Sequence, residues 1–292
     1  MKKDSIGHYL SPSGIRFALA DATAAARTAA EAHHLSPLGG TILGKVMLSA
    51  ALLAADFKNH EGVSIKWSTN TALGSIHCDA YEGGFVRGFL DYPEAVQGKA
   101  YSEDEEREYI GSHGNLFVTR YSLLKRPYVS SVDLESGSIS DCIDKYFQES
   151  DQTLSHMEIQ VSFCPDGTIR RLSGFMAQLL PEGDKELFDK LFSPSNRYDL
   201  YSEDTENPFS LQSLMNSADF FLCAEYPLAF RCTCGEERIK SSLMGLPAAE
   251  KESLLADEYI EINCHYCGKK YRIRRETLKK WFAEKTGGNK YE

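Results

Sequence analysis

Four of the eight cysteines of this 292-residue chain form two close pairs near its C-terminus. Cys232 and Cys234 make a Cys-x-Cys pattern, and Cys264 and Cys267 make a Cys-x-x-Cys pattern. A structural zinc site takes four ligands in a tetrahedron, and cysteine thiolates are among its preferred ligands. Two such pairs can converge on one ion when the segment between them folds back. The spacing therefore predicts one zinc ion held by all four thiolates.

The segment between the two pairs has the elements that folding back requires. Gly268 follows the second pair directly and lets the main chain turn its amides toward sulfur, as in a zinc knuckle. His265 offers a further nitrogen ligand, but four cysteines already complete a site, so we interpret it as a neighbour. The pattern predicts two short helices and then a hairpin whose turn carries the second pair: helices over Glu236–Leu246 and Ala248–Ala256, and strands over Tyr259–Ile262 and Lys270–Ile273.

The same cysteines are candidates for oxidation. In an extended Cys-x-Cys tripeptide the two Cα atoms lie about 6.6 Å apart, at the upper edge of disulfide geometry. Oxidation of Cys232 with Cys234 therefore requires some distortion of the backbone. The other four cysteines are dispersed along the chain, and we interpret them as small buried apolar residues: Cys78, Cys142, Cys164 and Cys223.

The first 180 residues contain helical and strand patterns in separate blocks, which is typical of an α+β fold with antiparallel pairs. Two helices rich in Ala and Gly are predicted over Phe17–His33 and Thr41–Phe57. The most apolar stretch, Leu38–Ala55, contains Lys45 and three glycines, which favours a buried helix over a membrane span. One further helix is predicted over Ile139–Phe147. Strands are predicted over Val63–Ser68, Leu73–Ala80, Phe85–Leu90, Asn115–Leu123, Tyr128–Leu134, His156–Phe163 and Thr168–Leu180.

Residues 181–230 differ in composition, with short helical patterns separated by polar, turn-rich sequence. We interpret them as a helical connector whose apolar side must lie against another apolar surface. The commoner alternative is that such helices simply complete the core, and the sequence pattern does not decide between the two. The apolar residues at helical spacing are Leu187, Phe188, Leu191, Phe192, Leu211, Leu214, Met215 and Ala218, and Phe220–Leu222 extend their surface.

Composition and charge argue against several classes of function. The 42% of hydrophobic and 25% of charged residues are typical of a globular protein. A net charge of −10 makes the chain a poor general binder of nucleic acid or anionic membranes. We find no secretory signal and no nucleotide-binding loop. We therefore expect a cytoplasmic protein with no enzymatic activity and no nucleic-acid, membrane or nucleotide partner.

The residues around the cysteines resemble the 33 kDa chaperonin family (heat shock protein 33), a family of redox-regulated bacterial chaperones. That family carries Cys-x-Cys, a long spacer and then Cys-x-x-Cys, which Phe230–Cys234 and Ile262–Cys267 match. The acidic stretch Ser102–Glu108 and the basic tail beyond Ile273 are less typical. Similar segments occur along nearly the whole chain, at Gly84–Gly88, Gln97–Ala100, Gly114–Thr119, Pro127–Val129, Tyr146–Gln152 and Gly174–Pro181.

The resemblance implies three parts: an α+β core domain over residues 1–180, a helical regulatory connector over residues 181–230, and a small zinc-binding redox-switch domain with a basic tail over residues 231–292. It also implies an ATP-independent holdase that binds unfolded client proteins. Such a protein is inactive while reduced and zinc-bound, and is a homodimer when oxidised. By the same resemblance, oxidation joins Cys232 to Cys234 and Cys264 to Cys267, releases zinc and unfolds the C-terminal part.

Two other functions use similar motifs. The basic stretch Lys269–Arg275, with an interleaved aromatic residue, is compatible with a zinc ribbon that binds nucleic acid. The acidic remainder of the chain favours instead a solvated face of a hairpin. A Cys-x-x-Cys motif also occurs in thiol–disulfide oxidoreductases, where it opens a helix of a thioredoxin-like βαβ unit. Here the preceding strand is predicted to lead into a hairpin turn, so the chaperone is the interpretation we favour.

Overall fold

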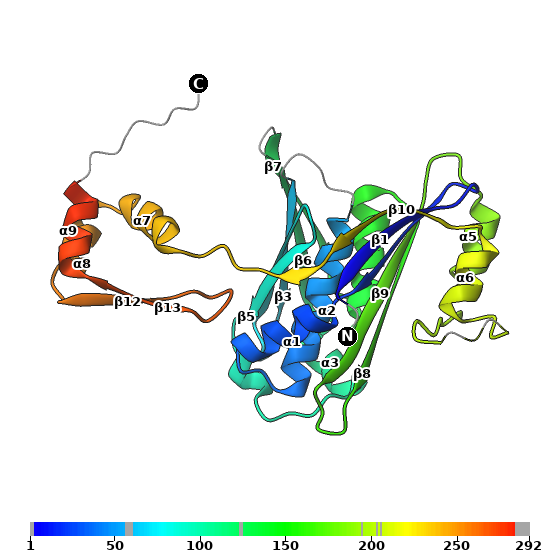
Figure 1. Ribbon diagram of the computed structural model, residues 1–292, viewed down its shortest axis with the longest axis horizontal. Helices are drawn as coiled ribbons and strands as arrows, with labels where there is room; N and C mark the ends of the chain where they lie inside the picture. Colours follow the sequence, from blue (N-terminus) through cyan, green and yellow to red (C-terminus); the bar gives the residue numbers. More distant parts are fainter. Residues whose placement is uncertain are drawn as a thin grey trace. The chain divides into compact units, whose positions relative to one another are not determined.

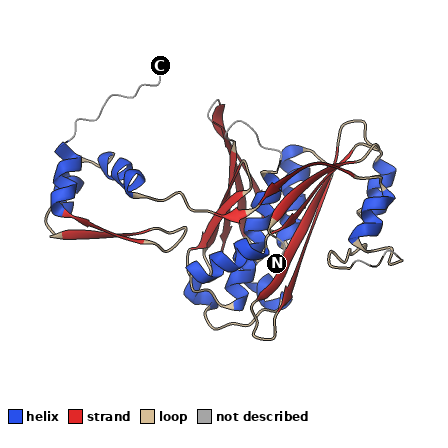
Figure 2. Ribbon diagram, in the orientation of Figure 1, coloured by secondary structure: helices blue, strands red, loops and turns tan. Residues whose placement is uncertain are grey.

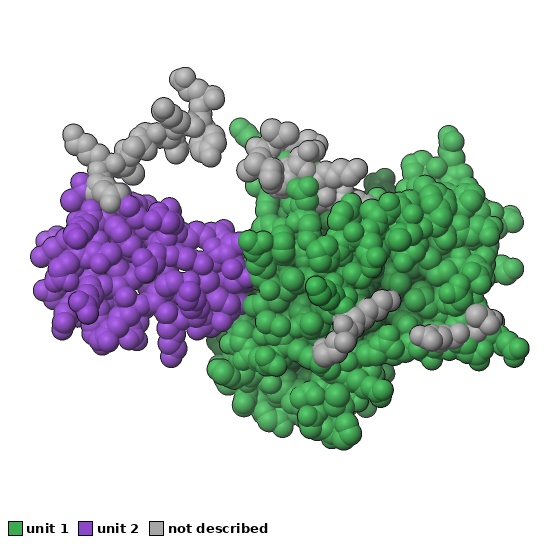
Figure 3. All heavy atoms as spheres, viewed as in Figure 1, with its two compact units in different colours: residues 1–231 green, residues 232–292 purple. Residues whose placement is uncertain are grey.

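The computed structural model describes residues 3–55, 61–122, 125–193, 195–202, 204 and 206–283 (Figure 1). The chain forms two compact units, unit 1 (residues 1–231) and unit 2 (residues 232–292), which Figure 3 shows in green and purple. Both units contain helices and antiparallel strands (Figure 2). The predicted α+β class is confirmed.

Five antiparallel strands form the first sheet of unit 1, in the order β10-β1-β2-β9-β8. Strands β8 and β10 are therefore its edges in the described part of the chain. The β8–β9 hairpin turns at the predicted place, where Gly167 adopts a φ of +82° that disfavours any residue with a Cβ. The strands are β1 (Ser5–Leu10), β2 (Ile15–Asp21), β8 (Ser155–Phe163), β9 (Ile169–Leu179) and β10 (Phe221–Pro227).

Six strands form the second sheet of unit 1, in the order β11-β5-β4-β3-β6-β7. All neighbours are antiparallel except β11, which pairs in parallel with β5. Because β10 and β11 are consecutive in the chain, only Leu228 separates the edge of one sheet from the edge of the other. The strands are β3 (Gly62–Thr69), β4 (Ser75–Tyr81), β5 (Phe85–Leu90), β6 (Gly114–Ser122), β7 (Lys125–Asp133) and β11 (Ala229–Phe230).

Helix α2 (Pro37–Leu53) is the centre of unit 1. It contacts strands of both sheets and is buried along almost its whole length (Figure 1). Its glycines allow helix α1 (Thr23–Ala32) to approach closely, since a Cβ on Gly44 would lie 2.8 Å from the Cβ of Ala26. The apolar stretch Leu38–Ala55 is thus a buried helix, as predicted. Among the described residues, no helix combines the length and apolar character needed to cross a bilayer.

Shorter helices lie between the strands of unit 1. No structure was predicted for the acidic stretch before β6, and this stretch forms a helix that is capped by Ser102. Glu106 of this helix pairs with Lys45 of α2 at 2.6 Å, and both side chains are nearly buried, so an ion pair anchors the helix on the core. The short helices are η1 (Pro93–Val96), α3 (Glu103–Ile110), α4 (Ile139–Tyr146) and η2 (Phe147–Asp151).

The first predicted helix, Phe17–His33, is wrong over its first residues. Residues Ile15–Asp21 form β2, which pairs with β1 and β9, and α1 begins only at Thr23. The Ala-rich sequence favours a helix locally, but pairing on both edges of the strand decides its conformation. Strand β1 also lacked a sequence signal. The predicted element ends at Phe57 and Leu123 lie outside the described residues.

Residues 181–230, here called the connector, contain the two expected helices, α5 (Lys185–Leu191) and α6 (Leu211–Ser217). Both pack on the face of the five-stranded sheet opposite to α1 and α2 (Figure 1). The second hydrophobic cluster of unit 1 joins them to that sheet face, and its buried members are Ile15, Phe17, Phe175, Ala177, Phe188, Leu191, Phe192, Tyr198, Leu200, Leu214 and Ala218.

The end of the connector differs from the prediction. Phe221 and Leu222 were expected to extend a buried apolar surface, yet they begin strand β10 and are 51% and 53% exposed. Nearly all side chains of β10 are exposed, so its pairing with β1 rests mainly on main-chain hydrogen bonds. The connector belongs to the same compact unit as residues 1–180. Its role as a separate regulatory part stays a prediction.

Unit 2 is small and has little apolar core. Among its described residues, the buried apolar side chains are those of Tyr271, Ile273 and Leu278. Helices α7 and α8 have no buried residue at all. The last helix, α9, lies in the basic tail, where none was predicted. The elements of unit 2 are α7 (Glu236–Met244), α8 (Ala248–Leu254), β12 (Tyr259–Asn263), β13 (Lys270–Arg274) and α9 (Arg275–Ala283).

Candidate metal centre

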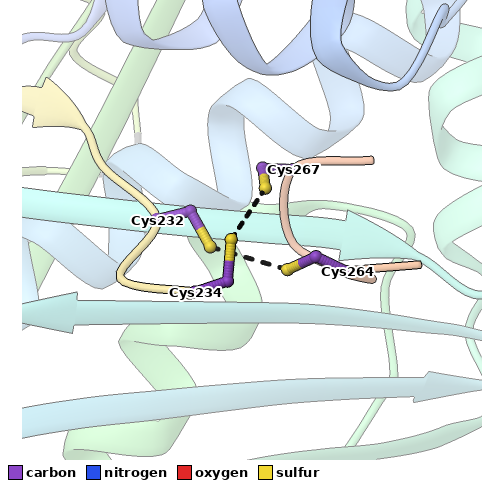
Figure 4. Close-up of side chains that lie close together, drawn as sticks. All are labelled: Cys232, Cys234, Cys264 and Cys267. Carbon is purple, nitrogen blue, oxygen red and sulfur yellow. Dashed lines mark hydrogen bonds between the residues drawn. The ribbon is translucent and has the colours of Figure 1, made fainter. Parts of the chain in front are cut away.

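The four paired cysteines meet at one point in unit 2 (Figure 4). Cys232 and Cys234 lie between β11 and α7, and Cys264 and Cys267 lie in the turn between β12 and β13. Their Sγ atoms all lie within 4.8 Å of one another. The fold therefore brings together all four predicted ligands, because α7 and α8 return the chain to its starting point.

The turn that carries the second pair has the geometry of a knuckle. The N–H of Cys264 donates to the carbonyl of Lys269 at 2.9 Å, and the N–H of Gly268 donates to the carbonyl of Cys264 at 2.8 Å. Gly268 has a φ of +68°, in the left-handed region that favours glycine. The main-chain N–H of Lys269 also donates to the sulfur of Cys267. This turn thus presents one main-chain N–H, that of Lys269, to a cysteine sulfur.

Three thiols of the cluster differ in how readily they ionise, because their pKa values are shifted in different directions. Burial opposes ionisation of Cys234, but hydrogen bonds from Tyr271 and from the other cysteines outweigh it and lower the pKa of Cys234 to about 7. Burial raises the pKa of Cys267, and its hydrogen bond to Cys234 adds to the effect. Burial likewise raises the pKa of Cys232. One thiolate therefore forms readily, and its neighbours resist adding further negative charge.

A zinc ion fits this donor set. Four thiolate ligands at about 2.3 Å from a tetrahedral ion stand roughly 3.8 Å apart. Two of the sulfur–sulfur distances, 3.6 Å from Cys232 to Cys264 and 3.4 Å from Cys234 to Cys267, lie close to that value. A divalent cation would also remove the repulsion that keeps the thiols protonated. Soft sulfur donors in a tetrahedral array select zinc over magnesium or calcium.

The sulfur contacts of 3.6 and 3.4 Å join a cysteine of the first pair to a cysteine of the second, Cys232 to Cys264 and Cys234 to Cys267 (Figure 4). A disulfide needs the sulfurs at about 2.05 Å, and the cysteines of the described chain are free thiols. The interleaved arrangement is what four ligands around one centre produce. It neither requires nor opposes the pairing of Cys232 with Cys234 and of Cys264 with Cys267, which stays a prediction.

The other four cysteines lie outside this cluster. Cys78 and Cys142 are buried, as predicted. Cys164 is only partly buried, and Cys223 is exposed on β10, so the interpretation as a buried apolar residue is wrong for Cys223. The reason is the same as for Phe221, because β10 is an edge strand with both faces accessible.

The sequence prediction missed one residue of the site. The hydroxyl of Tyr271 on β13 lies 3.1 Å from the sulfur of Cys234. A metal-bound thiolate carries no proton, so the phenol must be the donor in the loaded site. Alternation along β13 buries Tyr271 and Ile273 on one side of the strand. That alternation, together with the position of Tyr271 four residues after Cys267, is the sequence signal that could have identified Tyr271 as part of the site.

Replacing Tyr271 by Phe is expected to weaken metal retention. Removing a hydrogen bond to a ligand atom commonly costs about tenfold or more in metal affinity, because the ligand becomes less well oriented and less stabilised as an anion. We expect Tyr271→Phe to lose zinc about tenfold faster to a competing chelator. Tyr259→Phe on the same hairpin is the matched control. Equal release rates for the two variants would show that the phenol does not support the site.

The context of the second pair differs from that of an oxidoreductase. In the described part of unit 2, Cys264 and Cys267 lie in a hairpin turn between two antiparallel strands and not at the start of a helix. The helix that stabilises a reactive thiolate in thioredoxin-like proteins has no counterpart at this position. Four sulfurs gathered in this way could hold a metal ion.

Comparison with known proteins places this geometry in a family. The family model described as Hsp33 protein matches residues 4–274. The 33 kDa chaperonin of Lactococcus lactis subsp. cremoris is 30% identical over 274 residues, which cover 90% of this chain and 93% of that protein. The 33 kDa chaperonin of Caldanaerobacter subterraneus subsp. tengcongensis is 29% identical over 267 residues, covering 88% of this chain and 90% of its own length.

A solved structure shows the same fold. The crystal structure of the 33 kDa chaperonin (heat shock protein 33 homolog) of Thermotoga maritima matches with a TM-score of 0.82. The match covers 96% of this chain and 98% of that chain, at 22% sequence identity. The two proteins thus share the arrangement of sheets and helices although most of their residues differ.

Proposed function

The chain belongs to the Hsp33 family, and on this premise we propose that it is a redox-regulated, ATP-independent holdase that keeps unfolding proteins from aggregating. The observation that carries the proposal is the cluster of four cysteine sulfurs within 4.8 Å, in a unit that has almost no apolar core of its own. If the fold of unit 2 requires four thiolates to ligate a metal, oxidation of those thiolates to disulfides destabilises that fold.

In the reduced protein, Cys232, Cys234, Cys264 and Cys267 hold one zinc ion. Bound zinc would supply the positive charge that four neighbouring thiolates need, and would tie the start of unit 2 to its β12–β13 turn. The reducing cytoplasm is the compartment in which such a site persists. The connector then stays packed on the five-stranded sheet, and the aromatic surface beneath it is covered.

Oxidation removes ligands in pairs. A two-electron oxidant such as hydrogen peroxide converts one thiolate to a sulfenic acid with loss of hydroxide. The neighbouring thiolate attacks that sulfur, forms the S–S bond and releases a second hydroxide. The two sulfurs move to about 2.05 Å and lose their charge, so neither remains a good ligand. Cys264 and Cys267 close first, because Cys232 and Cys234 require distortion of an extended tripeptide.

Loss of the ion unfolds unit 2, and the connector then loses its folded end. Exposed apolar surface of this kind binds both unfolded clients and a second copy of the chain, which accounts for a homodimer in the oxidised state. Reduction reverses the sequence. The residues that become available are the buried or partly buried apolar side chains of the connector, Leu187, Phe188, Leu191, Phe192, Leu214 and Met215.

Light scattering of a thermally unfolding model protein tests this function. The reduced protein is expected to leave aggregation unchanged, and the peroxide-treated protein to suppress it at about one equivalent without ATP. A nucleic-acid binder would instead show salt-dependent retention of nucleic acid. Equal scattering with reduced and oxidised protein would contradict the proposal.

A further inference from the structure

The connector runs into unit 2 through residues 228–231, the last four residues of unit 1, here called the clasp. Three main-chain N–H groups of the clasp donate to carbonyls of two other segments of unit 1, the residue before β1 and the start of β5. Both ends of the clasp are therefore fixed by hydrogen bonds. These bonds run from Leu228 to Asp4 at 3.0 Å, from Ala229 to Gly84 at 2.9 Å and from Arg231 to Val86 at 2.9 Å.

The side chains of the clasp add to this attachment. Leu228 is 4% exposed and belongs to the hydrophobic cluster around α2, and Phe230 packs against the same cluster. The guanidinium of Arg231 lies 4.5 Å from the centre of the Phe85 ring. Strand β10, which precedes the clasp, leaves nearly all of its side chains exposed. The clasp, and not β10, is thus the firm attachment at this end of the connector.

A glycine makes room for the chain where it enters the clasp. Gly84 lies in the turn between β4 and β5 with a φ of +75°, and a Cβ added to it would overlap the carbonyl oxygen of Pro227. The neighbouring Gly83 has a similar φ of +82°, but a Cβ there would contact only the ring of Phe85, at 3.6 Å. The path of the chain into the clasp therefore depends on Gly84 and not on Gly83.

We propose that the clasp is the gate through which unit 2 controls the connector. A closed clasp keeps β10 paired with β1, and an open clasp lets β10 leave. This inference rests on the proposed function and names the contact that carries the signal. The physical reason is that a strand held at both ends loses less conformational entropy on pairing than a strand held at one end. Without the clasp, β10 is held only through the connector helices before it.

The metal acts on the clasp through the next residue in the chain. Cys232, one of the four proposed zinc ligands, follows Arg231 directly. A metal-bound Cys232 restricts the chain beside the clasp, so closing the clasp costs less further entropy. After zinc has left and unit 2 has unfolded, the clasp is the end of the ordered chain, and such ends fray. Opening of the clasp is then the step between metal loss and release of the connector.

Two variants open the clasp without touching a cysteine. Gly84→Ala places a methyl group where the carbonyl of Pro227 lies. Gly83→Ala is its matched control, because it adds the same methyl group in the same turn, at a similar φ, without meeting the clasp. Arg231→Gln removes the cation from the Phe85 ring and leaves the turn unchanged, so it carries the test if Gly84→Ala does not fold.

Three measurements on the reduced full-length protein follow the gate: hydrogen exchange of the amides of the clasp and of β10, zinc content, and suppression of client aggregation. We expect Gly84→Ala to speed exchange in both segments by roughly tenfold or more, because several main-chain hydrogen bonds are lost together. It should keep one zinc and suppress aggregation without peroxide, whereas Gly83→Ala should behave as the wild type. Arg231→Gln should speed exchange of the clasp about threefold and lower the peroxide dose for half-maximal activity.

The outcomes separate the gate from the function. A folded variant whose clasp exchanges faster, but whose activity stays that of the reduced wild type at every peroxide dose, would overturn the inference. Unchanged exchange of the clasp in both Gly84→Ala and Arg231→Gln would do the same, as would activity that appears in Gly84→Ala only because zinc is lost. Oxidised wild type that fails to suppress aggregation would instead overturn the proposed function.

Discussion

Replacing Cys232, Cys234, Cys264 and Cys267 together by serine is expected to abolish zinc binding and to unfold unit 2, while unit 1 stays folded. Among its described residues, unit 2 buries three apolar side chains, which is too few to offset the entropy of ordering its chain. Structural zinc in small domains supplies about 10–16 kcal/mol of apparent binding free energy, and much of it goes into folding. We therefore expect the metal to take the place of a hydrophobic core in this unit.

Metal analysis and hydrogen exchange measure the two effects on one sample. Wild-type protein should carry one zinc and protect the amides of the β12–β13 hairpin, and both should be lost in the quadruple variant. Cys223→Ser, which removes an exposed cysteine of unit 1, is the matched control and should behave as the wild type. Zinc retained at one equivalent after all four substitutions would place the metal elsewhere.

Ending the chain after Arg231 is expected to give a chaperone that needs no oxidation. The truncated chain keeps both sheets of unit 1, since β11 and the bond from the N–H of Arg231 to the carbonyl of Val86 remain. Its new terminus follows β10 closely, and β10 buries almost none of its side chains. Fraying at a chain end spreads into such weakly held strands, so we expect the connector to loosen from the sheet.

Aggregation assays under reducing conditions test the truncation. The truncated protein should suppress light scattering to about the level of the oxidised full-length protein, and the reduced full-length protein should not. Circular dichroism of the truncated protein establishes that it is folded. A folded, monomeric truncated protein that fails to suppress aggregation would show that the C-terminal part does not inhibit unit 1.

The sequence predicted that the four paired cysteines converge, and they do, because the residues that bring them together are local in the chain. Cysteines at short spacing, a glycine after the second pair and a short hairpin leave few alternatives. Most strands of the six-stranded sheet also followed from their own period-two alternation, with β5 predicted over its full length at Phe85–Leu90. In both cases the residues that decide the structure lie close together in the chain.

The missed features are those that depend on distant partners. Strand β2 carries an Ala-rich sequence that favours a helix, and only its neighbours β1 and β9 make it a strand. Strands β10 and β11 have pairing partners about 140 to 220 residues earlier in the chain, as in Pro227 with Ser5 and Phe230 with Val86. The side chain of Gln160 hydrogen-bonds the main chain of Tyr198 and Leu200, which lie about 40 residues later in the chain. No sequence pattern predicts such a contact, because it depends on a single side chain and not on a repeated spacing.

The central claim is that the four cysteines act as a switch for client binding and do not merely hold a metal. The direct test follows one sample during peroxide treatment by thiol mapping with mass spectrometry, zinc release to a chromogenic chelator and suppression of client aggregation. We predict that a Cys264–Cys267 disulfide forms first and a Cys232–Cys234 disulfide second, that zinc leaves, that protection of the client rises with them, and that reduction reverses all three. If both disulfides form and zinc leaves while client protection stays at the level of the reduced protein, the cysteines are a metal site and not a chaperone switch.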